Sequence, residues 1–154
     1  MQGNPEIIEV LNECLTAELT AVNQYFFHSK LCANWGYEKL AAHAREESID
    51  EMRDAEAFID RIIYLDGIPN MQRLFPIRAG ETVREQFTID LELETAAIER
   101  LNKGIALAQQ VGDNGSRDLM QRILVGEEAH ADWIESQLFA MNEIGDANYL
   151  SQQL

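Results

Sequence analysis

Four glutamates and one histidine stand where helices could combine them into a metal site. Glu127 and His130 form a Glu-x-x-His motif, and a spacing of three residues places both side chains on one helix face. Glu18, Glu51 and Glu94 each lie in a different segment of the chain. Carboxylates and imidazole suit iron, manganese or zinc, whereas a structural zinc site would use cysteine. These residue types therefore predict a bound metal, with redox chemistry if the metal is iron.

The same acids lie on stripes that should face a hydrophobic core. A single glutamate on such a stripe is usually a boundary residue, and a lone core histidine is usually structural. Here the acids recur at comparable depth on four stripes, and no lysine or arginine lies there to neutralise them. Because burying unpaired carboxylates would cost several kcal/mol each, bound cations are expected. The stripes, at spacings of three and four, are Leu11, Leu15, Glu18, Val22, Tyr25; Leu40, Ala44, Glu47, Glu51, Asp54, Phe58, Ile62, Leu65; Phe87, Leu91, Glu94, Ile98, Leu101, Ile105; and Met120, Ile123, Glu127, His130, Ile134, Leu138, Met141.

Four long helices must position these residues. Asn4 before Pro5 indicates an N-cap, Thr82 followed by Glu85 has the form of a capping box, and glycine-containing breaks separate the segments. The predicted helices span about 5–34, 37–66, 82–111 and 116–145, and residues 146–154 could add one or two turns.

The connections predict the topology. The first and last pairs of helices are joined by short loops, so each pair should be an antiparallel hairpin. The crossover segment, residues 67–81, is long enough to run the length of a helix, since about fifteen extended residues reach roughly 50 Å. Its apolar residues suggest that it packs on the bundle; they are Ile68, Met71, Leu74, Phe75 and Ile77. We expect an all-α fold with residues 1–154 in one domain: a four-helix bundle with one long crossover and a short C-terminal helix. In such bundles, two metal ions bridged by Glu51 and Glu127 would form a redox-capable centre.

Composition narrows the class further. The formal net charge of −15 argues against nucleic acid as a partner and suits a protein that collects cations. Cys14 and Cys32 fall in one helix about 27 Å apart, too far to bridge, so reduced thiols in a cytoplasmic protein are expected. No long apolar run or basic leader predicts membrane insertion or export.

The chain resembles the bacterioferritin family along essentially its whole length. The segments LTAELTAVNQYFFH, NWG, ESIDEM, GIPN, SRDLM and GEEAHADW carry the resemblance. It implies a ferritin-like homo-oligomer, a hollow shell of 24 subunits built from dimers, that oxidises Fe(II) and stores ferric mineral. It also implies haem b shared between two subunits.

The resemblance implies a ligand set for two iron ions. One ion would be held by Glu18, Glu51, Glu127 and the residue at position 54, and the other by Glu94, Glu127, His130 and Glu51. Tyr25 matches a tyrosine close to the centre.

Asp54 departs from the family, which has histidine at this position. An aspartate oxygen stands as many bonds from the backbone as Nδ1 of histidine, so Asp54 could reach the same ion. Its charge would favour ferric iron or leave one carboxyl protonated. We interpret Asp54 as a ligand of a working but altered centre. In the alternative, Asp54 lies behind the ligands without binding the ion, and that ion site is weak.

Met52 belongs to a second apolar stripe, with Ile49, Ile59 and Ile63, that points away from the core. By spacing alone this stripe indicates dimer packing, but the resemblance makes Met52 the haem ligand, supplied once by each of two subunits. It also implies that a small ferredoxin reductant docks near Ile68, Pro69 and Glu81. Glu46, Glu47 and Asp50 could line the inner face of the shell.

The predicted function is iron storage and detoxification by a di-iron ferroxidase that uses O2 or peroxide. The catalytic set would be Glu18, Glu51, Glu94, Glu127, His130 and Tyr25. The alternative function is that of a haem-binding structural subunit in a mixed shell with a second subunit type. Asp54 is the residue that leaves this alternative open. A DNA-protecting mini-ferritin is disfavoured by the negative charge, by the lack of a basic tail and by ligands that all come from one subunit.

Overall fold

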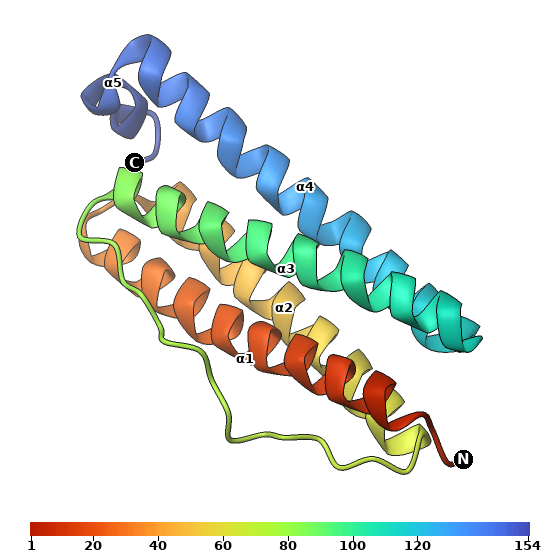
Figure 1. Ribbon diagram of the computed structural model, residues 1–154. Helices are drawn as coiled ribbons and strands as arrows, with labels where there is room; N and C mark the ends of the chain where they lie inside the picture. The colour runs from red at the N-terminus through yellow and green to blue at the C-terminus, as the bar shows by residue number, and fades with distance from the viewer.

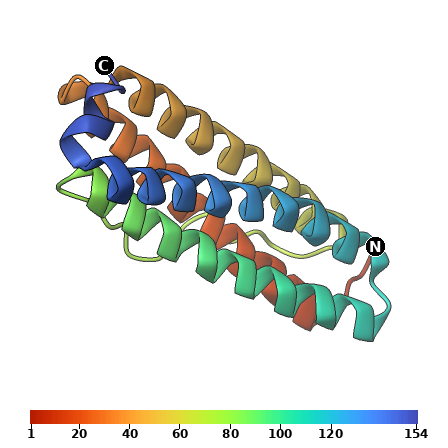
Figure 2. The same cartoon turned by 90° about the horizontal axis from the view of Figure 1, so that it is seen from above.

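The computed structural model describes all 154 residues, and four long helices form an antiparallel bundle (Figures 1 and 2). α1 and α2 form one hairpin, α3 and α4 the other, and α2 and α3 run in the same direction (Figure 1). This confirms the predicted all-α fold. The elements are α1 (Pro5–Asn34), α2 (Glu38–Tyr64), α3 (Val83–Val111), α4 (Asn114–Ile144) and α5 (Asp146–Ser151).

Local chemistry sets the helix limits. Asn4 Oδ1 accepts a hydrogen bond from the Glu6 amide at 2.8 Å, and Thr82 Oγ1 accepts one from the Glu85 amide at 3.1 Å. The Glu85 carboxylate in turn accepts from the Glu81 amide rather than from that of Thr82. None of the helices is both long and apolar enough to cross a membrane.

Two predicted limits are wrong by two residues. α2 ends at Tyr64 because Asp66 adopts the left-handed conformation at φ 58°. The Gly67 amide then donates to the Ile62 carbonyl, an arrangement that closes helices. α4 begins at Asn114, before Ser116, because the Asp113 side chain caps it and accepts from the Ser116 amide at 3.0 Å.

The hydrophobic core is divided into two clusters along the bundle. One cluster packs residues such as Leu11, Phe58 and Met120 near the N-terminal half of α1, and the other surrounds Phe87 and Met141. On every long helix the predicted site residues lie between these clusters, so the bundle has a polar middle layer. Cys14 and Cys32 are unbridged, and burial raises their thiol pKa values to about 12 and about 11.

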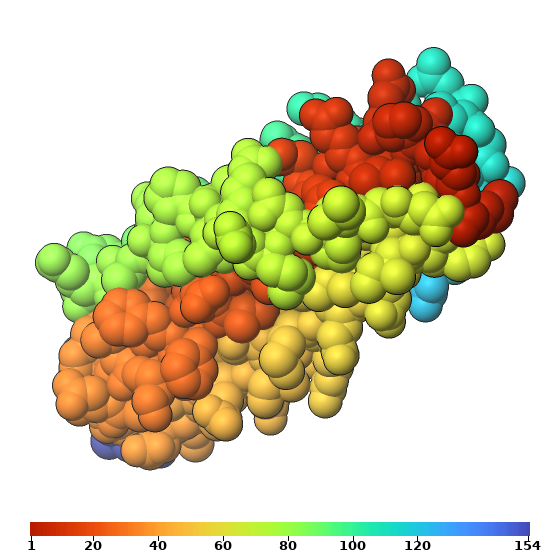
Figure 3. All heavy atoms as spheres, turned by 90° about the horizontal axis from the view of Figure 1, so that it is seen from below, coloured from red at the N-terminus to blue at the C-terminus, as the bar shows by residue number.

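The crossover segment runs along the bundle over α1 (Figures 1 and 3). The prediction that its apolar residues pack on the bundle is largely wrong, because Ile68 is 85% exposed and only Phe75 is substantially covered. The exposed apolar side chains are Ile68, Met71, Leu74 and Ile77.

Polar side chains of α1 hold the crossover segment instead. Thr20 Oγ1 accepts from the Phe75 amide at 2.9 Å, and His28 Nε2 accepts from the Gly80 amide at 3.1 Å. Because Nε2 accepts, the proton of His28 lies on Nδ1, which donates to Asp90 of α3 at 3.1 Å. The segment is therefore fastened by its backbone, which leaves its side chains exposed.

Candidate metal centre

The polar layer places one glutamate from each long helix in the middle of the bundle. Glu18 comes from α1, Glu51 from α2, Glu94 from α3 and Glu127 from α4. Each exposes at most 2% of its surface. Four carboxylates at this depth need protons or cations to remain there.

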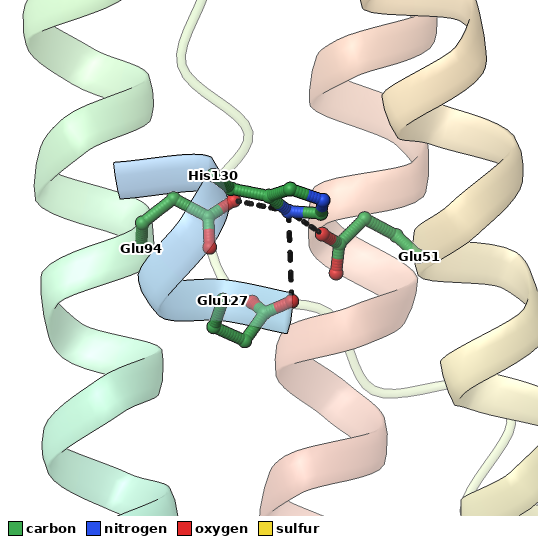
Figure 4. Close-up of side chains that lie close together, drawn as sticks. All are labelled: Glu51, Glu94, Glu127 and His130. Carbon is green, nitrogen blue, oxygen red and sulfur yellow. Dashed lines mark ion pairs between the residues drawn. The ribbon is translucent and has the colours of Figure 1, made fainter. Parts of the chain in front are cut away.

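The structure brings all six predicted ligands together in two overlapping groups. The ligand atoms of each group lie within 4.8 Å of one another, and Glu51 and Glu127 belong to both. The first group is Glu51, Glu94, Glu127 and His130, which Figure 4 shows converging from three helices. The second is Glu18, Glu51, Asp54 and Glu127. Two shared carboxylates between two ligand groups are the arrangement needed for a pair of bridged ions.

Several oxygens in these groups accept no hydrogen bond. They are Oε2 of Glu18, both carboxylate oxygens of Glu51, Oε2 of Glu94 and Oε1 of Glu127. Buried acceptors without donors are costly in a protein interior. Hard oxygen ligands with one imidazole fit ferrous and ferric iron, so the residues present suit that metal.

The His130 ring faces the carboxylates through Nδ1. This atom lies 3.0 Å from Glu51 Oε1, 3.7 Å from Glu127 Oε1 and 3.8 Å from Glu94 Oε1 (Figure 4). Burial opposes the charged form of His130, but contacts with Glu47, Glu51 and Glu94 outweigh burial and raise its pKa. Without metal, the imidazolium is the only cation among the ligands.

The carboxylates respond to crowding by holding protons. Burial, and then the charge of Glu51, raise the pKa values of Glu18 and Glu127, and burial also raises that of Glu94. A cation that binds among them would displace these protons.

Asp54 lies in the second group, less deeply buried than the glutamates. Burial and the neighbouring Glu51 charge raise its pKa to about 7. One Asp54 oxygen lies within 4.8 Å of the ligand atoms of Glu18, Glu51 and Glu127.

Tyr25 touches the site through one ligand. Its buried hydroxyl donates to Glu94 Oε1 at 2.5 Å, and burial together with the Glu94 charge raises the tyrosine pKa. A cavity of about 30 Å³, room for about two water molecules, adjoins Tyr25 and His130 and extends to Gln86.

Sequence reasoning missed the partners of His130 on its outer side. Glu47 Oε2 lies 2.8 Å from His130 Nε2, and Glu47 Oε1 lies 3.2 Å from His43 Nε2. Burial would raise the Glu47 pKa, but the contacts with His130 and His43 prevail and lower it to about 2. The available signal was the spacing of four residues between His43 and Glu47, which places both on one face of α2.

Met52 lies outside the core, one residue beyond Glu51. Its side chain is 50% exposed and borders a surface hollow of about 230 Å³. The hollow is lined by Val22, Asn23, Phe26, Arg45, Ser48, Ile49 and Met52.

The bundle and its central carboxylates define a ferritin-like domain, and residues 8–144 match the family of ferritin-like domains. Within that class the chain belongs to the bacterioferritin family. It is 51% identical over 152 residues to a bacterioferritin of Mycolicibacterium paratuberculosis, covering 99% of this chain and 96% of the relative. It is 52% identical over 151 residues to one of Streptomyces coelicolor, covering 98% and 90%. A bacterioferritin of Brucella melitensis is 42% identical over 149 residues, covering 97% and 92%.

Proposed function

We propose that the chain is a ferroxidase subunit that oxidises Fe(II) at the central layer and stores it as ferric mineral inside a hollow shell. The observation that carries this proposal is the pair of overlapping ligand groups that share Glu51 and Glu127. Membership of the bacterioferritin family supports the same activity.

The residues divide between two substrate ions. Glu18 and Asp54 hold one Fe(II), Glu94 and His130 hold the other, and Glu51 and Glu127 bridge them. His130 gives up the proton on Nδ1 when iron binds, and the glutamates release theirs. Tyr25 fixes the Glu94 carboxylate through its hydroxyl.

Pairing two ions matches the electron count of the oxidant. Two ferrous ions give one electron each, and one molecule of peroxide takes both and leaves with two protons as two waters. Dioxygen that takes two electrons and two protons leaves as hydrogen peroxide. Holding both ions in one place supplies the two electrons together.

A second candidate function rests on Asp54. If its carboxylate does not hold iron, the chain acts as a haem-binding structural subunit, and a second subunit type oxidises the iron. We favour the ferroxidase because the Asp54 carboxylate lies with Glu18, Glu51 and Glu127.

An anaerobic Fe(II) titration of the homo-oligomer, followed by one pulse of oxygen, separates the two functions. The ferroxidase predicts two tightly bound ions per subunit and fast appearance of ferric absorbance. One bound ion, or oxidation no faster than in buffer, would instead favour the structural subunit. Glu94→Ala is the control, since loss of a ligand should slow oxidation in a working site.

We infer that the hollow at Met52 receives a haem edge. Its walls include Val22, Phe26 and Ile49, and a thioether is a known axial ligand of haem iron. Met52 from each of two subunits would hold the haem, which when bound supplies electron transfer. Arg45 lines the same hollow and would supply a cation for a propionate.

The assembly follows from the family. A homo-oligomeric shell, in our proposal a cytoplasmic 24-mer built from dimers, would bury apolar side chains that one subunit leaves exposed, such as Val125 and Phe139. A small ferredoxin reductant would dock at the exposed Ile68 and the half-buried Pro69, beside the surface hollow between α1 and the crossover segment, with Glu81 at the far end of that segment.

A further inference from the structure

His43 contributes nothing to either ligand group, yet it lies two contacts away from the iron site. His43 Nε2 is 3.2 Å from Glu47 Oε1, and Glu47 Oε2 is 2.8 Å from His130 Nε2. On the inner side of the same ring, His130 Nδ1 is 3.0 Å from Glu51 Oε1. The three side chains form a continuous series from the flank of α2 to the ligands.

The His43 ring is fixed in place by α4. It stacks on the Trp133 indole with ring centroids 3.6 Å apart and an interplanar angle of 19°. Trp133 is held in turn by the edge-on ring of Phe87, at a centroid distance of 5.7 Å. Because Trp133 lies three residues after His130, the stack joins α2 to the stretch of α4 that carries the ligand.

Each oxygen of Glu47 lies within ion-pair distance of one histidine, although the contact at Oε2 does not have the geometry of a hydrogen bond. A carboxylate with two partners on opposite oxygens cannot rotate without breaking one contact. Glu47 therefore holds a carboxylate oxygen 2.8 Å from His130 Nε2. For a metal-binding histidine, the partner of the outer nitrogen decides the tautomer and the ring orientation.

We propose that His43 is a positioning residue: acting through Glu47, it holds His130 with Nδ1 turned toward the iron that Glu94 also binds. The inference rests on the proposed function, because it concerns the same ligand group. His43 touches neither iron nor oxidant, so its effect is on the orientation of the ligand.

Two substitutions at position 43 separate the polar contact from the ring stacking. His43→Phe keeps a flat ring against Trp133 but cannot contact Glu47 through a donor. His43→Gln gives up the ring but keeps a nitrogen donor the same number of bonds from Cα as Nε2. The probe is Co(II), titrated without oxygen into the metal-free homo-oligomer and followed by its visible absorption.

We expect two Co(II) ions per subunit in the unaltered protein. In His43→Phe the affinity for one of the two should fall about tenfold, the usual size of effect when a partner behind a metal ligand is lost. His43→Gln should retain both ions near the original affinity. Glu47→Ala removes the middle of the series and should repeat the loss, which keeps the inference testable if His43→Phe does not fold.

Two results would overturn the inference. His43→Phe and Glu47→Ala could bind two Co(II) ions as tightly as the unaltered protein, or His43→Gln could lose affinity while His43→Phe keeps it, which would assign the effect to stacking. Failure of the proposed function looks different, since the unaltered protein itself would then not bind two ions.

Discussion

Asp54 adds a fifth carboxylate to the two ligand groups, and this changes how the site responds to pH. Burial and the Glu51 charge raise its pKa from the ordinary 3.8 to about 7. In the metal-free protein the folded state therefore keeps a proton that the unfolded state releases near pH 4. The resulting stabilisation is full below about pH 4 and is lost as the pH rises through about 7.

We expect the Tm of the metal-free protein to fall between about pH 5 and about pH 8. The raised pKa values of Glu18, Glu94 and Glu127 act in the same direction. Asp54→Asn, which cannot ionise, should make the fall shallower, whereas Asp60→Asn at an exposed position of α2 should not. Calorimetry across this range measures both, and a Tm that rises with pH would contradict the pKa direction.

The site residues illustrate what one sequence can predict. The six ligand candidates stand out because acids interrupt apolar stripes, and the structure does bring them together. The roles of His43 and Trp133 could not be predicted from the sequence, because they depend on α2 facing α4. Glu47, grouped by sequence with inner-face acids, has its carboxylate between two histidines. Periodicity gives the face of one helix but not which faces meet.

At the level of the elements, capping residues predicted helix limits, but composition did not predict how the crossover segment is held on the bundle. The limits 5–34 agree with α1, because Asn4 and Pro5 act locally. For the crossover segment, apolar content suggested packing, but backbone donors and polar α1 side chains decided its position. Hydrogen bonds between distant segments leave no periodic signal in a sequence.

The attachment of the crossover segment predicts the effect of Thr20→Val. Valine has nearly the same shape as threonine but leaves the Phe75 amide without its acceptor at 2.9 Å. We expect a loss of about 1 kcal/mol in the free energy of unfolding and faster proteolysis between residues 67 and 81. Thr88→Val removes an exposed hydroxyl that also donates to a helix carbonyl, and it serves as the control. Proteolysis unchanged by Thr20→Val would mean that side-chain packing holds the segment.

The whole molecule exposes an apolar hollow at Met52 that one subunit alone does not fill. We expect Met52→Leu to give a shell that assembles and stores iron but lacks the haem Soret absorbance, because leucine keeps the packing and removes the thioether. Met71→Leu, at an exposed position of the crossover segment, is the matched control. Haem retained after Met52→Leu would refute the assignment of this ligand.

The central claim, two iron ions held between Glu51 and Glu127, is tested most directly by anomalous diffraction from crystals soaked with Fe(II) without oxygen. The account predicts two iron peaks in every subunit. Glu51 and Glu127 should contact both ions, Asp54 and Glu18 one of them, and His130 Nδ1 and Glu94 the other. A single peak, or an Asp54 carboxylate turned away from both ions, would contradict it.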